Sequence, residues 1–382
     1  MKISYLLADP GIAVFGTKGA SVHVQEVVRA LRAGGHQVTV FCVRRGDAVP
    51  ADLADLDVVE VPLGSHDGDA PARERAVAVA AAALTRVAAT RQADLVYERY
   101  ALWSTAGRDL ARRLGARLVV EVNAPLVEEH RTHRGIHDEA GAWAATRTTL
   151  TGADLVACVS EPVARWAAAV APVAAHRVSV VPNGVNTDRI RPGTHGFEGP
   201  FTIGFVGTLK PWHGTDLLLE AIATSGPRGS QSWQLDICGT GPELPALQTR
   251  ALDLGIAEQV RFRGAVDPSR IPRLLTGFTV AVAPYPPGEH YFSPLKVYEY
   301  LAAGLPVVAS AIGELPQLLD HGRVGVLVPP GDVRALGAAL GDLAADPDAR
   351  ARLGSAAREL AVAEHDWARR CADILDRLPA AV

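Results

Sequence analysis

Residues 2–43 read KISYLLADPGIAVFGTKGASVHVQEVVRALRAGGHQVTVFCV, and this stretch contains the unit from which the fold is predicted. Apolar runs at 2–8 and 37–43 are typical of buried strands, because strands of a parallel sheet are covered on both faces. The segment 21–34 between them has the spacing of an amphipathic helix and ends at a pair of glycines. A strand, a helix and a second strand in this order predict a parallel βαβ unit.

The same alternation continues along the chain. Further strands are expected at 94–98, 117–122, 154–160 and 177–182, and then at 201–207, 233–239, 259–264, 278–285, 305–310 and 324–329. The fold class is therefore α/β, with two doubly wound halves. We expect an N-terminal domain over 1–190, a C-terminal domain over 200–360 and a linker within 186–200. A C-terminal helix is expected over 361–382, with packing back on the first domain as one option.

Composition narrows the class of protein. The 382 residues are 48% hydrophobic and 21% charged, which is typical of a globular protein. A net charge of −4 argues against a nucleic-acid partner. The four cysteines show no metal-binding spacing and suit reduced thiols, which favours a cytoplasmic location. The N-terminus does not resemble a signal peptide, and no apolar run is long enough to predict a transmembrane segment.

In each half, a glycine-containing loop follows the first strand. Gly16 and Gly19 precede the first helix, where free amides favour anionic oxygens. The segment GFVGTLKPWHG (204–214) carries Lys210, a cation that could neutralise a diphosphate. No acid ends the second strand, where Arg44 stands instead, so a nicotinamide-cofactor site is disfavoured. An ordinary tight turn and a solvated lysine are the alternatives for these two loops.

A third segment, YFSPLKVYEYLAAGLPVVAS (291–310), combines a helix start with a buried strand. Ser293 and Pro294 are predicted to begin the helix, so that the amides of Leu295 and Lys296 would point at an anion.

Glu299 lies further along the same helix. A carboxylate on a partly buried helix needs a specific partner, and the two hydroxyls of a ribose could supply a bidentate one. A surface salt bridge is the alternative.

In this order the three segments resemble the retaining GT-B glycosyltransferases of the bacterial glycosyltransferase family 4. The resemblance covers nearly the whole chain, and it extends to DLVYERY (94–100), EVNAP (121–125), VSE (159–161), VVPNGVN (180–186) and ICGTGPE (237–243). It implies the GT-B fold, two Rossmann-like domains that face each other across a cleft. A nucleotide-sugar donor would bind mainly to the second domain and an acceptor to the first. No metal or other cofactor is implied.

The resemblance also implies site residues. Lys210, Lys296 and Asn123 are the candidate catalytic residues. The candidate donor-binding residues are Gly19, Thr208, His213, Gly239, Ser293, Pro294, Leu295 and Glu299. Gly19 matches the glycine loop over the donor phosphates, and Glu299 matches the second acid of the family's Glu-x7-Glu motif.

The chain departs from the family pattern at several of these positions. Tyr291 stands where the first acid of Glu-x7-Glu is expected. Thr208 and His213 stand where Arg and Lys are commonest, which leaves Lys210 and Lys296 as the expected diphosphate cations. These changes concern the sugar contacts more than the reaction class.

Candidate acceptor-binding residues lie in the first domain and include Glu98, Arg99, Glu128 and Glu129. Together with Asp138 and Glu139, the acids of the loop after 121–125 could attract a cationic acceptor such as an amino sugar or aminocyclitol. An ordinary solvated helix of mixed charge is the alternative. A lipid-linked or polysaccharide acceptor, with peripheral membrane contact, stays open.

The expected function is the retaining transfer of a sugar from a nucleotide sugar to a hydroxyl of a small acceptor. A nucleotide-sugar 2-epimerase is the alternative enzyme, which Tyr291 in place of an acid disfavours. A non-catalytic nucleotide- or sugar-binding protein is the third possibility, and the presence of both Lys210 and Lys296 disfavours it.

Overall fold

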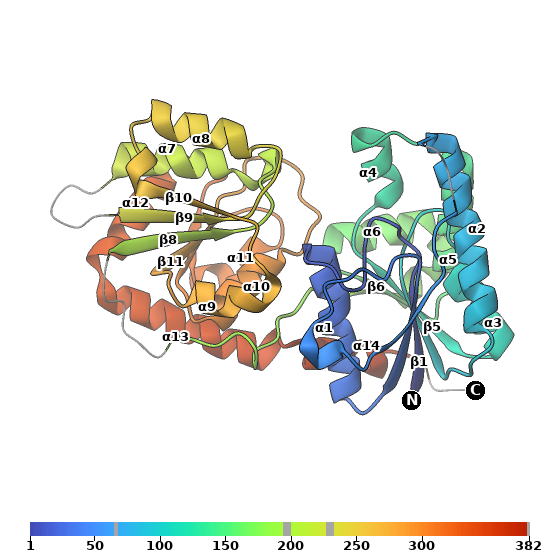
Figure 1. Cartoon of the computed structure of the whole chain (residues 1–382). Coiled ribbons are helices and arrows are strands. Elements are labelled where there is room, and N and C mark those ends of the chain that lie inside the picture. The colour runs from blue at the N-terminus through green and yellow to red at the C-terminus, as the bar shows by residue number, and fades with distance from the viewer. Residues whose placement is uncertain (65–67, 194–199, 227–232, 380–382) are drawn as a thin grey trace. The chain divides into compact units, whose positions relative to one another are not determined.

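The computed structural model describes residues 1–64, 68–193, 200–226 and 233–379. The chain forms two compact units (Figure 1). The first contains Met1–Asn183, Tyr291–Ser293 and Trp367–Val382, and the second contains Gly184–His290 and Pro294–Asp366. Residues 194–199 of the predicted linker lie outside the described residues. Each unit is taken by itself below.

In the described part of the first unit, parallel strands form one seven-stranded sheet in the order β3-β2-β1-β4-β5-β6-β7. These strands are β1 (Lys2–Leu7), β2 (Gln37–Cys42), β3 (Asp57–Glu60), β4 (Leu95–Arg99), β5 (Arg117–Val122), β6 (Leu155–Cys158) and β7 (Val178–Val180). The helices are α1 (Gly19–Ala33), α2 (Ala70–Ala88), α3 (Ala106–Leu114), α4 (Leu126–His133), α5 (Glu139–Gly152), α6 (Glu161–Val170) and α14 (Trp367–Asp376).

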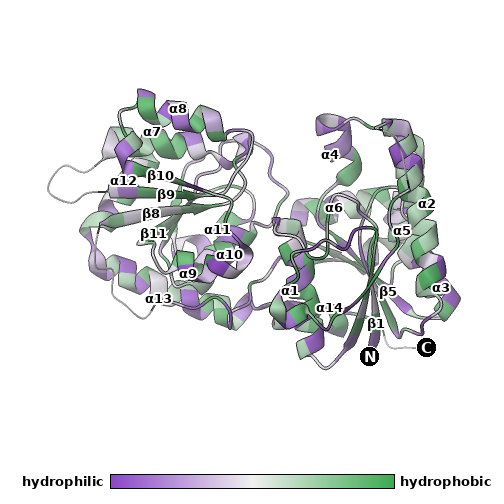
Figure 2. Ribbon diagram, viewed as in Figure 1, coloured by the Kyte–Doolittle hydropathy of each residue, from purple (hydrophilic) through white to green (hydrophobic). Residues whose placement is uncertain are grey.

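Helices cover both faces of this sheet, which is why its central strands are buried and mostly apolar. Helices α1 and α14 lie on one face, and α2, α3 and α5 lie on the other (Figure 1). Every residue of β4 and β6 is buried. Hydrophobic residues accordingly run through the strands, whereas several helices have one polar side (Figure 2).

Strand β3 is absent from the sequence-based prediction. Its sequence is DVVE, and it lies at the edge of the sheet with both acidic ends exposed. A short edge strand lacks the long apolar run of a central strand, so the pattern used for the other strands cannot detect it.

In the described part of the second unit, parallel strands form a six-stranded sheet in the order β10-β9-β8-β11-β12-β13. The strands are β8 (Phe201–Val206), β9 (Trp233–Cys238), β10 (Val260–Gly264), β11 (Val280–Ala283), β12 (Val307–Ser310) and β13 (Val326–Val328). The helices are α7 (Thr215–Ser225), α8 (Leu244–Asp253), α9 (Ile271–Leu275), α10 (Leu295–Ala302), α11 (Leu315–Leu318), α12 (Val333–Ala345) and α13 (Pro347–Glu364). The predicted fold class, two doubly wound α/β units, is confirmed.

The last helix belongs to the first unit. Helix α14 packs against α1, where the ring of Trp367 meets the ring of His23 edge-on at 4.9 Å between centroids. The thiol of Cys371 lies 3.9 Å from the carbonyl oxygen of Val27. All four cysteines are buried and none forms a disulfide, in keeping with the prediction of buried reduced thiols. Among the described residues, no helix combines the length and the apolar character that crossing a membrane requires.

Candidate active site

In each sheet the strand order reverses beside its first strand, between β8 and β11 in the second unit and between β1 and β4 in the first. Ligands of open α/β sheets bind at such a point, beyond the carboxyl ends of the strands. In the second unit the loops after β8 and β9 touch there through Gly207 and Gly239. A Cβ atom on Gly239 would lie 1.8 Å from the carbonyl oxygen of Gly207, and both residues have a positive φ, 153° and 149°. Only glycine fits this contact, which leaves bare backbone at the edge of the sheet.

Lys296 reaches this edge from the first turn of α10. Its Nζ lies 4.2 Å from the centre of the Phe205 ring and 5.3 Å from that of Tyr285. The nitrogen is buried and has no hydrogen-bond partner among the described residues. Burial lowers the pKa of Lys296 to about 7, although the charge of Glu299 acts in the opposite direction. A buried ammonium group without a partner is costly, so this position favours an anionic ligand.

His213 lies beside Lys296 but does not add a second positive charge. Burial, and then the charge of Lys296, lower the pKa of His213 to about 3, so its imidazole is neutral at pH 7. Its Nδ1 contacts the carbonyl oxygen of Thr208. The structure thus brings four of the predicted donor-site residues together: Lys296, His213, Thr208 and Gly239.

Lys210 occupies a more open position. Its Nζ lies 5.4 Å from the ring of Trp212, which is 44% exposed. A cation over an exposed aromatic ring gains little stabilisation, so Lys210 is available to a ligand only at the surface of this loop.

The start of α10 differs from the prediction in one residue. The N-cap is Pro294, with no side-chain cap, and Leu295 is the first helical residue. The Ser293 hydroxyl instead accepts a hydrogen bond from the backbone N–H of Asn183, at 3.1 Å. Ser293 and Asn183 both belong to the first unit. The prediction that Ser293 begins the helix is therefore wrong, because this side chain binds the backbone of another segment.

In the first unit, Glu121 is the centre of a buried polar network. Its Oε1 lies 2.8 Å from His23 Nε2 and accepts hydrogen bonds from Arg99 at 3.0 Å and Asn123 at 2.6 Å. Tyr97 donates to Oε2 at 2.6 Å. Burial alone would raise the pKa of Glu121, but the neighbouring His23 and Arg99 hold it well below its ordinary value. The sequence analysis did not predict this role of Glu121. The available signal was its place in EVNAP, two residues before the candidate Asn123.

The network fixes Asn123, a predicted catalytic residue, at the carboxyl end of β5. Because the amide nitrogen of Asn123 donates to Glu121, its carbonyl oxygen faces away from that carboxylate. Arg99, a predicted acceptor contact, is buried and paired with Glu121. The structure therefore assigns Arg99 to the interior of the first unit.

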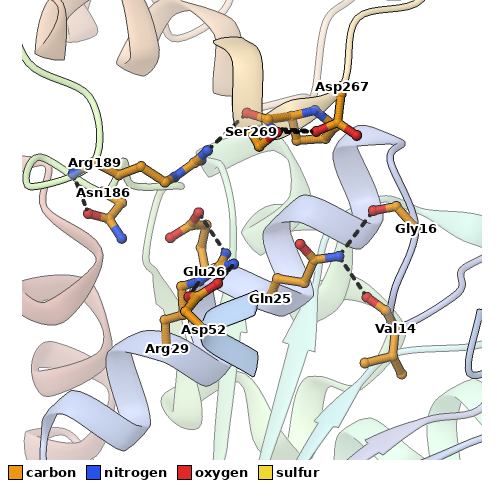
Figure 3. Close-up of polar contacts among 11 residues, drawn as sticks. Val14, Gly16, Gln25, Glu26, Arg29, Asp52, Asn186, Arg189, Asp267 and Ser269 are labelled. Carbon is orange, nitrogen blue, oxygen red and sulfur yellow. Dashed lines mark hydrogen bonds and ion pairs between the residues drawn. The ribbon is translucent and has the colours of Figure 1, made fainter. Parts of the chain in front are cut away.

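The glycine loop before α1 is held by a residue that the sequence motifs did not indicate. The side-chain amide of Gln25 donates to the carbonyl oxygens of Val14, at 2.9 Å, and Gly16, at 3.0 Å (Figure 3). Helix α1 begins at Gly19, and its N-cap Lys18 supplies no side-chain hydrogen bond. The first amides of α1 are thus without a side-chain cap, as an anion site requires.

The acids that were expected to attract a cationic acceptor have partners inside the first unit. Glu98 is fully buried and accepts a hydrogen bond from Ser104 at 3.0 Å. Burial raises its pKa to about 7. Glu128 accepts from Trp166 at 2.8 Å, and Glu129 accepts from Tyr291 at 3.1 Å.

Asp138 and Glu139, the remaining acids of this set, have local partners. Asp138 caps α5 by accepting the N–H of Gly141 at 2.8 Å, and Glu139 accepts from Trp143 at 3.2 Å. Each of these acids thus has at least one partner within the first unit, and a cationic acceptor stays a prediction.

Potential metal ligands do not gather anywhere in the part of the chain that the structure describes, where no three His, Cys, Asp or Glu side chains share a site. The polar groups at the switch point of the second sheet are an ammonium group, backbone amides and a neutral imidazole. This set offers positive charge and hydrogen-bond donors to an anion.

Comparisons with known proteins agree with this arrangement. The family described as Glycosyltransferase Family 4 matches residues 17–189, and the one described as Glycosyl transferases group 1 matches residues 200–346. The D-inositol 3-phosphate glycosyltransferase of Acidothermus cellulolyticus is 30% identical over 380 residues, which span 91% of this chain and 82% of that protein. The chain belongs to glycosyltransferase family 4.

A second relative of this family 4 enzyme is a mannosyltransferase. The GDP-mannose-dependent alpha-(1-6)-phosphatidylinositol monomannoside mannosyltransferase of Mycolicibacterium smegmatis is 32% identical over 283 residues, 70% of this chain and 72% of that protein. Among solved structures, HepE of Anabaena in complex with UDP and glucose aligns over 100% of both chains with a TM-score of 0.75 and 20% identity. Sucrose-phosphate synthase from Thermosynechococcus elongatus aligns over 98% and 97% with a TM-score of 0.75 and 21% identity. The glycosyltransferase has the GT-B fold.

Proposed function

We propose that this glycosyltransferase moves a sugar from a nucleotide-sugar donor to a hydroxyl of a small acceptor, with retention of the anomeric configuration. The observation that carries the proposal is Lys296. Its Nζ is buried at the switch point of the second sheet and has no hydrogen-bond partner among the described residues. A diphosphate would provide the anionic oxygens that this ammonium group needs.

The residues around Lys296 fit a nucleoside diphosphate group by group. Gly207 and Gly239 leave bare backbone on which phosphate oxygens can approach closely. The uncapped first turn of α10 adds amides that favour negative charge. Glu299 follows Lys296 by three residues on the same helix, and its carboxylate would accept hydrogen bonds from two ribose hydroxyls.

The proposed chemistry is a front-face substitution. The bond between the anomeric carbon and the phosphate oxygen breaks, and the electron pair leaves with the nucleoside diphosphate. The acceptor oxygen bonds to the same face of that carbon, and its proton passes to the departing phosphate. Lys296 and the amides would stabilise the charge that develops on this phosphate, so the contribution of the protein is positioning and electrostatics.

The relatives support the donor and acceptor classes. One is named as dependent on GDP-mannose, and HepE was crystallised with UDP and glucose, so a nucleoside diphosphate sugar is the proposed donor. Two relatives are named for inositol phosphate and phosphatidylinositol monomannoside acceptors. We accordingly propose a hydroxylated ring compound as the acceptor.

Incubation with UDP-glucose, UDP-N-acetylglucosamine and GDP-mannose, first without an acceptor, tests this function. Slow hydrolysis of one of them, replaced by transfer when D-inositol 3-phosphate is added, is the expected result. The Lys296→Ala variant is the matched control and should lose both reactions. Conversion of a nucleotide sugar to its 2-epimer, or binding without any turnover, would overturn the proposal.

A further inference from the structure

A cavity opens at the switch point of the first sheet, beyond the carboxyl ends of β1 and β4. Asp9, Pro10 and Gly11 follow β1, and Ala101, Leu102 and Trp103 follow β4. The other walls come from the start of α2, from α4 and from the loop after α4. All of these residues belong to the first unit, so the cavity is complete within it.

Trp103 forms an aromatic wall of this cavity in a costly backbone conformation. Its φ is 56°, in the left-handed region that bulky residues rarely adopt. The indole N–H donates to the carbonyl oxygen of Asp138 at 2.9 Å, which fixes the ring. Strain of this kind persists where the surrounding structure enforces it, often at ligand sites. The flat face of a fixed indole is a surface on which a sugar-like ring can pack.

The size and apolar character of the cavity suit one ring. Its volume is about 130 Å³, and an engineered protein cavity of about 150 Å³ accommodates benzene. Leu102, Leu126 and Val77 line it together with Trp103. One carboxylate in the wall, Asp9, uses Oδ1 to accept the N–H of Gly11 at 2.7 Å, and its second oxygen remains for a ring hydroxyl.

The charged side chains of the cavity favour an anionic substituent on that ring. Arg73 and Arg134 both line the cavity and are exposed, and Arg134 also forms a solvent-exposed ion pair with Glu129 at 3.5 Å, which is weak enough for a phosphate to compete with it. His130 also lines the cavity: burial and the charge of Arg134 lower its pKa, so its imidazole is a neutral hydrogen-bonding group at pH 7. Glu74 does not offset them toward a ligand, because its two carboxylate oxygens accept the backbone N–H groups of His137 and Asp138 at 2.9 and 2.7 Å.

We propose that this cavity is the acceptor site and that Arg73 and Arg134 select an acceptor whose ring carries a phosphate ester. The ring would pack on Trp103, a hydroxyl would bind Asp9, and the phosphate would lie at the two guanidinium groups. Arg binds phosphate oxygens with two parallel hydrogen bonds, which makes it suited to this selection. The proposal rests on the proposed function only in naming the ligand an acceptor.

The test uses the whole protein and three probes that share one ring: glucose, glucosamine and glucose 6-phosphate. Titration calorimetry should show glucose 6-phosphate binding at least about tenfold more tightly than the other two. Vesicles of phosphatidylcholine with and without phosphatidylinositol form a second arm. Binding of the free phosphate identifies a soluble acceptor, and binding only of phosphatidylinositol vesicles identifies a lipid one; either supports the proposal if Arg73 is required.

Substitutions of Arg73 in α2 and Arg134 after α4 are compared with that of Arg75, which serves as a matched control in α2. Arg73→Gln and Arg134→Gln should each weaken binding of the phosphate-bearing probe by about tenfold. Arg75→Gln should not, because Arg75 lies on the same helix, pairs at 3.7 Å with Asp69 and does not line the cavity. Equal losses in all three variants would show a general charge effect and overturn the proposal.

Separate measurement of UDP and GDP binding keeps the two proposals distinguishable. If a nucleotide binds but neither glucose 6-phosphate nor phosphatidylinositol does, or if glucosamine binds more tightly, the acceptor proposal is overturned and the proposed function stands. If the phosphate-bearing probe binds in an Arg73-dependent way but no nucleotide does, the cavity keeps its assigned chemistry and the proposed function fails.

Discussion

The ammonium nitrogen of Lys296 lies 4.2 Å from the centre of the Phe205 ring, and Glu299 is the charge that acts on it from the same helix. Burial weakens the ammonium form and outweighs the opposing charge of Glu299, whereas a bound diphosphate would strengthen it. Binding of a diphosphate should therefore raise the pKa of Lys296 and favour its charged form.

Nucleotide-sugar binding should depend on pH through Lys296. Because burial lowers its pKa to about 7, the lysine is charged below that pH and increasingly neutral above it. The anion favours the charged form, so affinity for the nucleotide sugar should fall by up to about tenfold per pH unit above pH 7. Calorimetric titration at about pH 6, 7 and 8, with whichever nucleotide sugar the protein binds, measures this change in affinity. Lys296→Gln should bind weakly with no such slope, and a wild-type affinity that is flat across the range would refute the assignment.

Glu299→Gln should weaken binding of the nucleoside diphosphate by one to two orders of magnitude. Gln keeps the size of the side chain but loses the charge and one acceptor, and hydrogen bonds to a charged group contribute about 1.5–3 kcal/mol. Titration with UDP and GDP, with circular dichroism as the check on folding, makes the comparison. The matched variant is Glu289→Gln, which changes the neighbouring acid outside α10. Unchanged affinity in folded Glu299→Gln protein would remove the ribose contact from the account.

Glu121→Gln should lower the free energy of unfolding by about 3 kcal/mol, since removing one member of a buried ion pair leaves its partners uncompensated. Its pKa is lowered on folding, so the stabilisation is present above the ordinary Glu range and is lost as the pH falls below it. Urea denaturation of wild type and variant at neutral and acidic pH tests both statements. Glu139→Gln, at a carboxylate 39% exposed, is the control and should change stability by less than about 0.5 kcal/mol. Equal stability of the two variants would contradict the role given to Glu121.

Activity should not require a metal ion. Lys296 and the backbone amides supply positive charge where a metal would otherwise neutralise the leaving diphosphate. Rates measured with EDTA should match those without it. Loss of activity in EDTA that magnesium or manganese restores would mean that these donors do not suffice.

The fold class could be predicted because strands and helices each leave a pattern within a short stretch of sequence. Most strands of the two sheets contain apolar runs, and helices with amphipathic spacing separate them, so 2–43 already predicts a parallel unit. Strand β3 was missed because DVVE, at a sheet edge, has no apolar run. The order of the strands across each sheet, which determines the switch point, depends on contacts between distant segments. The spacing of hydrophobic residues does not predict it.

Site residues that lie in one motif could likewise be predicted, whereas those that come from distant segments could not. Lys296 and Glu299 could be found because they lie in one continuous motif, but the rings of Phe205 and Tyr285 that surround Lys296 come from other strand ends. The burial of Glu98, a candidate acceptor contact, could not be read from its motif, because burial depends on the elements that pack around the end of β4. Asp9 and Trp103 meet only when β1 and β4 pair, so no spacing in the sequence could indicate their cavity.

The anomeric configuration of the first product tests the central claim most directly. With an α-linked nucleotide sugar as donor and D-inositol 3-phosphate or a ring phosphate that binds the cavity as acceptor, proton NMR during the first turnovers reports the linkage before any rearrangement. The account predicts an α-linked product formed together with one nucleoside diphosphate. A β-linked product would contradict retention, and a 2-epimerised nucleotide sugar without transfer would contradict the assignment of this protein as a transferase.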